Sequence, residues 1–425
     1  MRLPFTGTPT GTMTRTSTSA VTVLILAGCY VAAVTPGVAN AADARQIHYT
    51  QWDSGAEFAT GQSRGLTISQ GRLVLDGPAT PPRSSRSVAY ERSSWESPWT
   101  SPGFAFTELI PSWSARTPGN SLVEIRVRGR DTVGALSSWD LMARWASGDR
   151  YLKRSTAAGQ KDDLAKVNVD TWQATTELTS YQVRVTLARR AGSSLRPSVD
   201  MVGAVASRLP GDATATSAPG VGRGIVLDVP RYSQMVHEGH YPQWNGGGEA
   251  WCSPTSTSMV LGYYDKLPAP SAYGWVPEGH VDPWVDYAAR MTFDYDYDGT
   301  GNWPFNTAFA APRVGKGFVT RLRSLREAER FIAAGIPLVA SISFGTGALD
   351  GAPMGSTAGH LLVIVGFTKS GDVVVNDPAS HTRRGVRRTY DRAQFEQAWL
   401  PTSGGTVYVI HDAAHPLPAG GQTNW

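Results

Sequence analysis

Cysteine is almost absent from this sequence, which contains only Cys29 and Cys252 among 425 residues. So few cysteines exclude the disulfide framework on which many small exported domains depend. Beyond its N-terminus the sequence also lacks an uninterrupted run of about 18 apolar residues, the length that a membrane-spanning helix needs. Its formal charge of +4 gives no indication of binding to nucleic acid or to an anionic surface. These absences leave a globular protein, long enough for two domains and without a stable membrane span.

The N-terminus has the pattern of an export signal. Arg2 and Arg15 precede a short apolar run, Ala20–Ala27, and Ala39-Asn40-Ala41 supplies the small residues of a cleavage site. We therefore expect residues 1–41 to be a signal peptide and the mature protein to be secreted. The sequence LAGC that ends at Cys29 also resembles a bacterial lipobox, so a lipid anchor at Cys29 is an alternative. Cleavage after Ala41 would leave Cys252 as a single thiol, either buried or reactive.

Residues 42–206 are rich in strand patterns. Leu122–Arg128 and Tyr181–Leu187 alternate apolar with polar residues, as antiparallel strands do when one face of their sheet meets solvent. This segment predicts a β-sandwich-like domain of unknown role. Residues 207–224 are rich in Pro, Gly, Ala and Thr and lack periodicity, which predicts a linker. Residues 412–425 would form a C-terminal tail.

Residues 225–411 mix helical and strand patterns. A helical pattern runs over Pro254–Lys266. Two later helices are expected to begin at sequences that resemble an N-terminal capping box, Ser324–Glu327 and Asp391–Gln394. Strand patterns follow at 338–344, 361–367, 372–375 and 407–410. A helix first and hairpin-linked strands later predict an α+β domain rather than a doubly wound parallel sheet.

Cys252 lies just ahead of the helical pattern that contains Pro254. Proline is favoured at the first position of a helix, which would place Cys252 at the N-terminal mouth. Unpaired backbone N–H groups and the positive end of the helix dipole favour a thiolate there. The local sequence alone is equally compatible with a buried, inert cysteine.

A hairpin is expected to bring His360 and Asp377 together. His360 starts one strand pattern, Asp377 follows the next, and a turn around Lys369-Ser370 would place them directly opposite each other. A slip at the turn would make them diagonal neighbours, still within side-chain reach. A carboxylate that accepts from the imidazole Nδ1–H would orient the ring. Together with Cys252, the pair indicates nucleophilic catalysis.

Three sequence blocks, in this order, resemble the signature of the bacteriocin-processing-like cysteine peptidases (clan CA, family 39-like). They are CSPTS at Cys252–Ser256, GHLLVIVGF at Gly359–Phe367 and VNDPA at Val375–Ala379. The upstream VPRYSQ at Val229–Gln234 is similar to the block that carries this family's oxyanion glutamine.

The resemblance implies a papain-like cysteine peptidase domain over residues 225–411 that hydrolyses peptide bonds without a metal or an organic cofactor. It further implies that Cys252 is the nucleophile, His360 the general base and acid, Asp377 the orienting group and Gln234 the oxyanion donor. The expected partner is a peptide or protein substrate.

The sequence departs from the family pattern at three places. Ser253 stands where the family usually has Gly, and Gln234 lies well ahead of Cys252, so the nearer Gln243 is a rival oxyanion donor. Asn376 adjoins Asp377 but would point to the opposite face of the hairpin. A catalytically silent papain-fold binding protein of the cell envelope, or a cell-wall peptide hydrolase or transacylase, therefore remains an alternative.

Other motifs carry weaker indications. Asp294–Gly299 resembles the start of a calcium loop, but the twelfth position is Phe305, which has no carboxylate. His237 and His240 could bind a metal, although exposed polar loop residues are the simpler interpretation. Tryptophans of the N-terminal segment could form a platform for cell-wall glycan, or they could be core residues: Trp95, Trp99, Trp113, Trp139 and Trp145.

Overall fold

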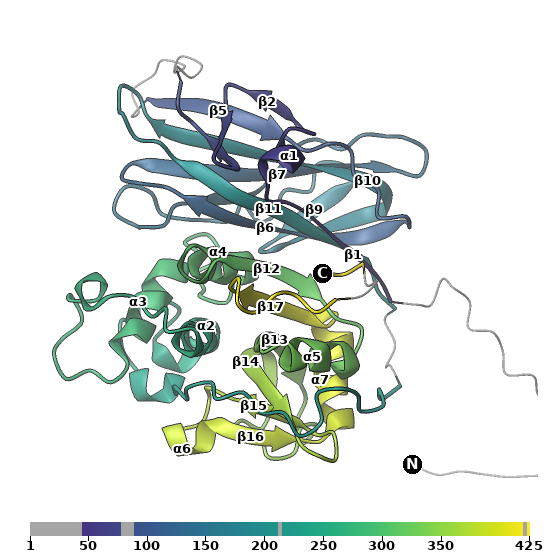
Figure 1. Ribbon diagram of the computed structural model, residues 1–425, viewed down its shortest axis with the longest axis vertical. Helices are drawn as coiled ribbons and strands as arrows, with labels where there is room; N and C mark the ends of the chain where they lie inside the picture. The colour runs from purple at the N-terminus through teal and green to yellow at the C-terminus, as the bar shows by residue number, and fades with distance from the viewer. Residues whose placement is uncertain (1–44, 78–88, 211–214, 420–422) are drawn as a thin grey trace, which may run out of the picture. The chain divides into compact units, whose positions relative to one another are not determined.

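The computed structural model describes residues 45–77, 89–210, 215–419 and 423–425. The expected signal peptide and the alternative anchor at Cys29 lie outside these residues. The described residues belong to one compact unit, in which an all-β part precedes a mixed α/β part (Figure 1). In the described ranges, no helix combines the length and the apolar character needed to cross a bilayer.

The described residues of the N-terminal part form an antiparallel sheet of eleven strands and one short helix, α1 (Gly55–Phe58). Its strands are β1 (Gln46–Trp52), β2 (Gln62–Arg64), β3 (Thr67–Ser69), β4 (Arg72–Val74), β5 (Tyr90–Glu96), β6 (Phe106–Arg116), β7 (Ser121–Asp131), β8 (Asp140–Trp145), β9 (Ala165–Asn168), β10 (Thr171–Arg190) and β11 (Ser198–Arg208).

The long strand β10 joins what would otherwise be two sheets. Its first residues pair with β6 and β9, and its later residues pair with β7 and β5. Irregular pairing on either side of Leu178 bends the strand between these partners. The all-β prediction is therefore confirmed, but hydrogen bonding runs through one continuous sheet and does not separate into the two sheets of a sandwich.

Most of the N-terminal tryptophans are core residues. Trp95, Trp113 and Trp145 are buried. Trp139 is partly exposed, and the Arg184 guanidinium lies over its ring, 3.9 Å from the centroid. Packing accounts for three of the five tryptophans that could have formed a sugar platform.

The C-terminal part is built on a six-stranded antiparallel sheet in the order β12-β17-β13-β14-β15-β16. The strands are β12 (Lys316–Arg321), β13 (Leu338–Phe344), β14 (Thr357–Phe367), β15 (Val373–Asn376), β16 (Arg387–Tyr390) and β17 (Thr406–His411). The helices are α2 (Cys252–Tyr263), α3 (Pro283–Thr292), α4 (Trp303–Val314), α5 (Leu325–Ala333), α6 (Arg383–Val386) and α7 (Arg392–Ser403).

Helices lie on both sides of this sheet. Figure 1 shows α2 beside one face and α5 and α7 beside the other. Every residue of β14 from His360 to Phe367 is accordingly buried, without the alternation of a strand that has one wet face. Helix α2 begins at Cys252 and not at Pro254, so the proline is the third helical residue, where its missing N–H still costs no intrahelical hydrogen bond.

The ends of the C-terminal part are tied down by hydrogen bonds. In the segment predicted as a linker, the Ser217 N–H donates to Glu396 at 2.7 Å and the Gly222 N–H donates to Glu329 at 2.9 Å. At the chain's end, the Tyr49 N–H donates to the carbonyl of Thr423 at 2.6 Å. Hydrogen bonds therefore anchor both segments to the fold at these points.

Aromatic packing and ion pairing join the all-β and α/β parts. The Phe305 ring of α4 lies 6.0 Å from the Trp113 ring and 5.1 Å from the Trp145 ring, measured between centroids. The Arg290 guanidinium makes a bidentate ion pair with Asp149, with N–O distances of 2.8 and 3.0 Å. Because Phe305 is fully buried, its contacts with both tryptophans are shielded from water.

The substitution Phe305→Ala should therefore lower the free energy of unfolding by about 3–5 kcal/mol, the usual cost of removing a buried phenylalanine ring. Urea unfolding followed by tryptophan fluorescence measures this loss. Tyr151→Ala, at a half-exposed position of the N-terminal part, is the matched control and should change stability by less than about 0.5 kcal/mol. A Phe305→Ala protein as stable as the control would contradict the packing described above.

Candidate active site

Cys252 is the first residue of helix α2 and the only cysteine in the described part of the chain. The helix is preceded by Trp251, a fully buried residue whose Nε1 donates to the carbonyl of Trp244 at 2.7 Å. This anchor fixes the backbone immediately before the thiol. Cys252 itself is partly exposed, so it is neither sealed in the core nor on an open surface.

His360 and Asp377 meet through a hydrogen bond of 2.8 Å between Nε2 and Oδ1. In the hairpin of β14 and β15, Val363 lies opposite Asn376 and Ile364 opposite Val375. Continuing this register places His360 opposite Ala379, which is also what a turn around Lys369-Ser370 gives by counting, so His360 and Asp377 are diagonal neighbours and not the directly opposite pair that we expected. Between Ile364 and Gly366, nearer the turn, the pairing shifts by one residue.

The imidazole nitrogen that contacts the carboxylate is not the expected one. We expected Nδ1 to face Asp377, but Nε2 does so. The thiol of Cys252 also interacts with His360, and Nδ1 is the nitrogen left for it. The ring can therefore contact the carboxylate on one side and the thiol on the other.

Asp377 is a buried carboxylate held by three donors. Besides His360, the Tyr390 hydroxyl donates to Oδ2 at 2.7 Å and the Ala379 N–H donates to Oδ1 at 3.0 Å. Burial alone would raise the pKa of Asp377, but attraction to His360 and these hydrogen bonds outweigh it, so the pKa is lowered. Tyr390 was not found by sequence reasoning, because nothing in its local sequence signals that β16 lies next to β15.

The same pairing acts on the imidazole. Burial lowers the pKa of His360, but the Asp377 carboxylate, with a smaller contribution from Cys252, outweighs burial and raises the pKa to about 10. His360 is therefore protonated at neutral pH. Because folding raises this pKa, the pair stabilises the fold fully below about pH 6.5, and the contribution is lost as the pH rises through about 10.

Cys252 and His360 line one cleft of about 490 Å³. Gln234 also lines it, while Gln243 is exposed and is not among the described cleft residues. The Gln234 N–H donates to the carbonyl of Pro378 at 2.9 Å, next to Asp377, and its side-chain amide donates to the carbonyl of Glu249. The turn that carries Gln234 is thus fixed to the strand end that carries Asp377.

The two other departures from the family pattern have structural roles. The Ser253 hydroxyl is buried and lies 2.9 Å from the hydroxyl of Tyr408. The Asn376 side chain points away from His360, as expected, and donates to the carbonyl of Pro230 at 3.0 Å. It also accepts a hydrogen bond of 2.6 Å from Arg387.

The all-β part supplies one wall of the cleft, which the sequence did not reveal. The two-residue turn between β9 and β10, Val169-Asp170, lines the cleft together with Tyr297 and Trp303. Asp170 accepts a hydrogen bond of 3.3 Å from the N–H of Trp303, and burial raises the pKa of its carboxyl to about 6. Val169 has φ = 26°, a left-handed conformation that is strained for a β-branched residue.

The calcium-like loop makes internal hydrogen bonds. The buried Asp294 carboxylate accepts from the N–H groups of Thr156 and Asp296 at 3.0 and 3.1 Å, and from the Asn302 amide at 3.0 Å. These bonds tie the loop that leads to α4 to the all-β part. Phe305, at the twelfth position, is a core residue of α4.

The interpretation of His237 and His240 as exposed loop residues is wrong. The His237 side chain is fully buried, and that of His240 is 24% exposed. Both imidazoles contact the Asp286 carboxylate of α3. The sequence gave no sign of this third residue, because it lies 46 positions beyond His240.

Comparison with known families identifies both parts. Residues 226–407 match the model of the Peptidase_C39 like family, and residues 48–207 match that of the Peptidase C39 N-terminal domain. Residues 226–407 thus belong to the C39-like peptidase family, as the three sequence blocks predicted. A search of the curated proteins found no match.

The titration of His360 can be followed directly by NMR of its imidazole. In the unmodified protein the midpoint should be near pH 10, and Asp377→Asn should lower it by several pH units, since burial remains while the carboxylate is lost. Tyr390→Phe, which removes one hydrogen bond to the same carboxylate, is the milder control. A midpoint near 6.5 in all three proteins would contradict the coupling of His360 to Asp377.

Proposed function

We propose that this protein is a secreted cysteine peptidase that hydrolyses peptide bonds through a Cys252/His360/Asp377 triad on a papain-like fold. The observation that carries the proposal is that Cys252 and His360 line one cleft while Asp377 holds the imidazole from behind. The partly exposed thiol, the buried charged pair and the adjoining glutamine are the parts that acyl transfer requires. The substrate is a peptide or a protein.

In the first half of the reaction, the Cys252 sulfur attacks the carbonyl carbon of the scissile bond. The carbonyl oxygen becomes an oxyanion, which the Gln234 amide and a backbone N–H at the start of α2 would stabilise. His360 gives its proton to the leaving nitrogen, the C–N bond breaks, and a thioester with Cys252 remains. The pKa of about 10 supports this role, because it keeps the imidazole protonated before the attack.

In the second half, water replaces the amine product. Neutral His360 takes a proton from the water, whose oxygen attacks the thioester carbon; the C–S bond breaks, and the acid product leaves with the thiolate restored. The lowered pKa of Asp377 supports a carboxylate that stays ionised throughout. Attack by an amine in place of water would give transacylation through the same thioester.

The position of Gln234 favours it over Gln243 as oxyanion donor. Gln234 lies on the cleft, whereas Gln243 is exposed. One N–H of the Gln234 amide donates to the carbonyl of Glu249, and a primary amide has a second N–H to offer. Glu249 directly precedes Ala250, in the segment that leads into Cys252, so this hydrogen bond would hold the amide near the nucleophile.

If Cys252 is the nucleophile, iodoacetamide should inactivate residues 42–425 faster at pH 6 than it alkylates a simple thiol. Cys252→Ala should abolish hydrolysis in a peptide-library digestion analysed by mass spectrometry. Tyr151→Ala, at a half-exposed site, is the control for expression and folding. Full hydrolysis by Cys252→Ala would refute the enzyme proposal, and absence of hydrolysis by the unmodified protein would favour a silent binding protein.

The oxyanion assignment is tested by a pair of glutamine variants. Gln234→Ala should lower kcat by about 10²–10³-fold, the usual effect of losing one oxyanion donor, with little change in KM. Gln243→Ala should leave both constants within about twofold. The reverse result would transfer the role to Gln243.

A further inference from the structure

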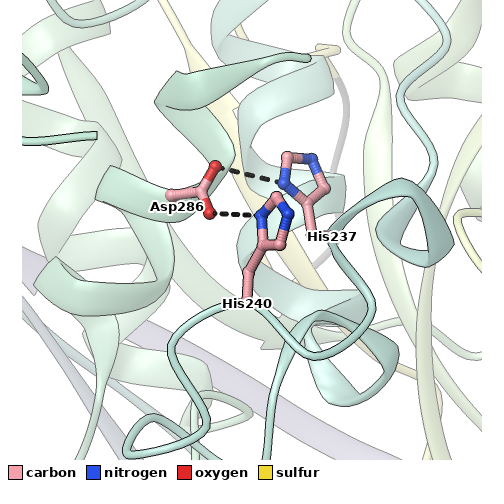
Figure 2. Close-up of side chains that lie close together, drawn as sticks. All are labelled: His237, His240 and Asp286. Atoms are coloured by element: carbon pink, nitrogen blue, oxygen red, sulfur yellow. Dashed lines mark hydrogen bonds and ion pairs between the residues drawn. The ribbon is translucent and has the colours of Figure 1, made fainter. Parts of the chain in front are cut away.

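His237, His240 and Asp286 form a second cluster of chemically active side chains. His237 ends the short 3₁₀ turn Gln234–His237, His240 lies in the loop that follows, and Asp286 is in the first turn of α3. Figure 2 shows a nitrogen of each imidazole ring facing one oxygen of the same carboxylate, which lies to one side of both rings. None of the three residues lines the catalytic cleft described above.

The spacing of the cluster suits a single small cation. The His237 Nδ1 lies 3.1 Å from Asp286 Oδ2, and the His240 Nδ1 lies 3.0 Å from Oδ1. One ligand atom from each residue falls within 4.8 Å of the other two. Zinc binds imidazole nitrogen and carboxylate oxygen at about 2.0–2.2 Å, so one ion can reach all three after small side-chain movements.

Burial supports a ligand at this place. The His237 and Asp286 side chains are fully buried, which is costly for a carboxylate unless a cation or several donors accompany it. Among the described residues, the Nδ1 atom of His237 and the Oδ2 atom of Asp286, which face each other, both lack a hydrogen-bond partner. A buried imidazole with an unsatisfied nitrogen indicates that the site is incomplete as a purely internal hydrogen-bond network.

The surroundings add negative charge and a further candidate ligand. Asp282 interacts electrostatically with both His237 and Asp286, and its carboxylate is paired with Arg383 at 2.5 Å. Two carboxylates beside one guanidinium leave an excess negative charge. The His280 ring stacks on His240 with centroids 4.3 Å apart, and within the described structure its buried Nδ1 has no hydrogen-bond partner.

We propose that His237, His240 and Asp286 bind a divalent transition-metal ion of the Zn²⁺ type, with His280 or water as the fourth ligand. Two imidazoles and a carboxylate are a donor set that zinc accepts and that magnesium and calcium do not prefer. The ion would fasten the loop of His240 and the turn of His237 to helix α3. Since Gln234 begins that turn, the metal would also limit its movement, but the binding claim does not depend on catalysis.

The test uses residues 42–425 carrying Cys252→Ala, so that the active-site thiol cannot bind the probe. After dialysis against a chelator, Zn²⁺ is titrated by calorimetry, and thermal unfolding is recorded with and without the ion. One Zn²⁺ should bind per chain and raise the melting temperature by several degrees, because a ligand that binds only the folded state stabilises it.

Variants locate the site. His240→Ala alters the most exposed of the three ligands, so the protein should fold, and it should weaken Zn²⁺ binding at least tenfold and remove most of the thermal shift. His415→Ala is the matched control, because His415 also contacts a carboxylate, Asp412, at 2.7 Å but lies outside the cluster. It should bind Zn²⁺ as the parent does.

Two results would overturn the proposal. If the parent binds no Zn²⁺, the cluster is only a structural contact in which both imidazoles lie against Asp286. If His240→Ala binds Zn²⁺ as tightly as the parent, the ion lies elsewhere. Hydrolysis is not measured in either experiment, so failure here leaves the peptidase proposal intact, and failure of that proposal leaves this one intact.

Discussion

The buried carboxylate of Asp377 is the group on which the architecture of the candidate site depends. A negative charge in the core must be matched by donors, and here the donors come from three places: the imidazole of β14, the hydroxyl of β16 and the backbone just after β15. Satisfying this one charge therefore fixes three neighbouring segments in register. The same interaction holds His360 in its orientation and keeps it protonated.

The residues on either side of Asp377 connect the end of β15 to the start of the C-terminal part. Pro378 accepts the N–H of Gln234, and Asn376 binds the carbonyls of Val229 and Pro230. The segment 229–234 is thereby fastened to the end of β15 on both sides of Asp377. His360 and Gln234 come from distant parts of the sequence, and both are held near the end of β15 by Asp377 and its neighbour Pro378.

Much of this arrangement could be predicted from local patterns. The helix mouth at Cys252, the strand of His360 and its hairpin with Asp377 follow from capping, periodicity and turn signals, which act over a few residues. The diagonal placement was one of the two arrangements considered, and counting from a turn at Lys369-Ser370 gives it. The identity of the contacting nitrogen could not be predicted, because it depends on the groups that surround the ring in the folded protein. Asp391 is the N-cap of α7, as predicted, and its carboxylate accepts a hydrogen bond of 2.9 Å from the Gln394 N–H. At α5, however, Glu327 accepts from the Arg323 N–H instead of completing a box with Ser324.

Contacts between distant segments had no sequence signal at all. Tyr390 and Asp286 look like ordinary residues of a strand and a helix until the fold places them beside Asp377 and the histidines. The partners of Asp294 and Phe305 in the all-β part are equally invisible, since each pairs residues more than a hundred positions apart.

The turn at Val169-Asp170 belongs to the all-β part but lines the cleft of the α/β part, so both parts of the chain form the cleft. A β-branched residue in a left-handed conformation persists only where its surroundings impose it, and here the tip of a hairpin presses against the start of α4. The shape of the cleft therefore depends on two separate segments of the sequence, the Val169-Asp170 turn and the start of α4. Mutations can change either segment without changing the other. Lengthening this hairpin by a residue, or relaxing it with glycine, would reshape the cleft without altering Cys252, His360 or Asp377. The all-β part thus helps to determine the shape of the cleft through the residues that line it.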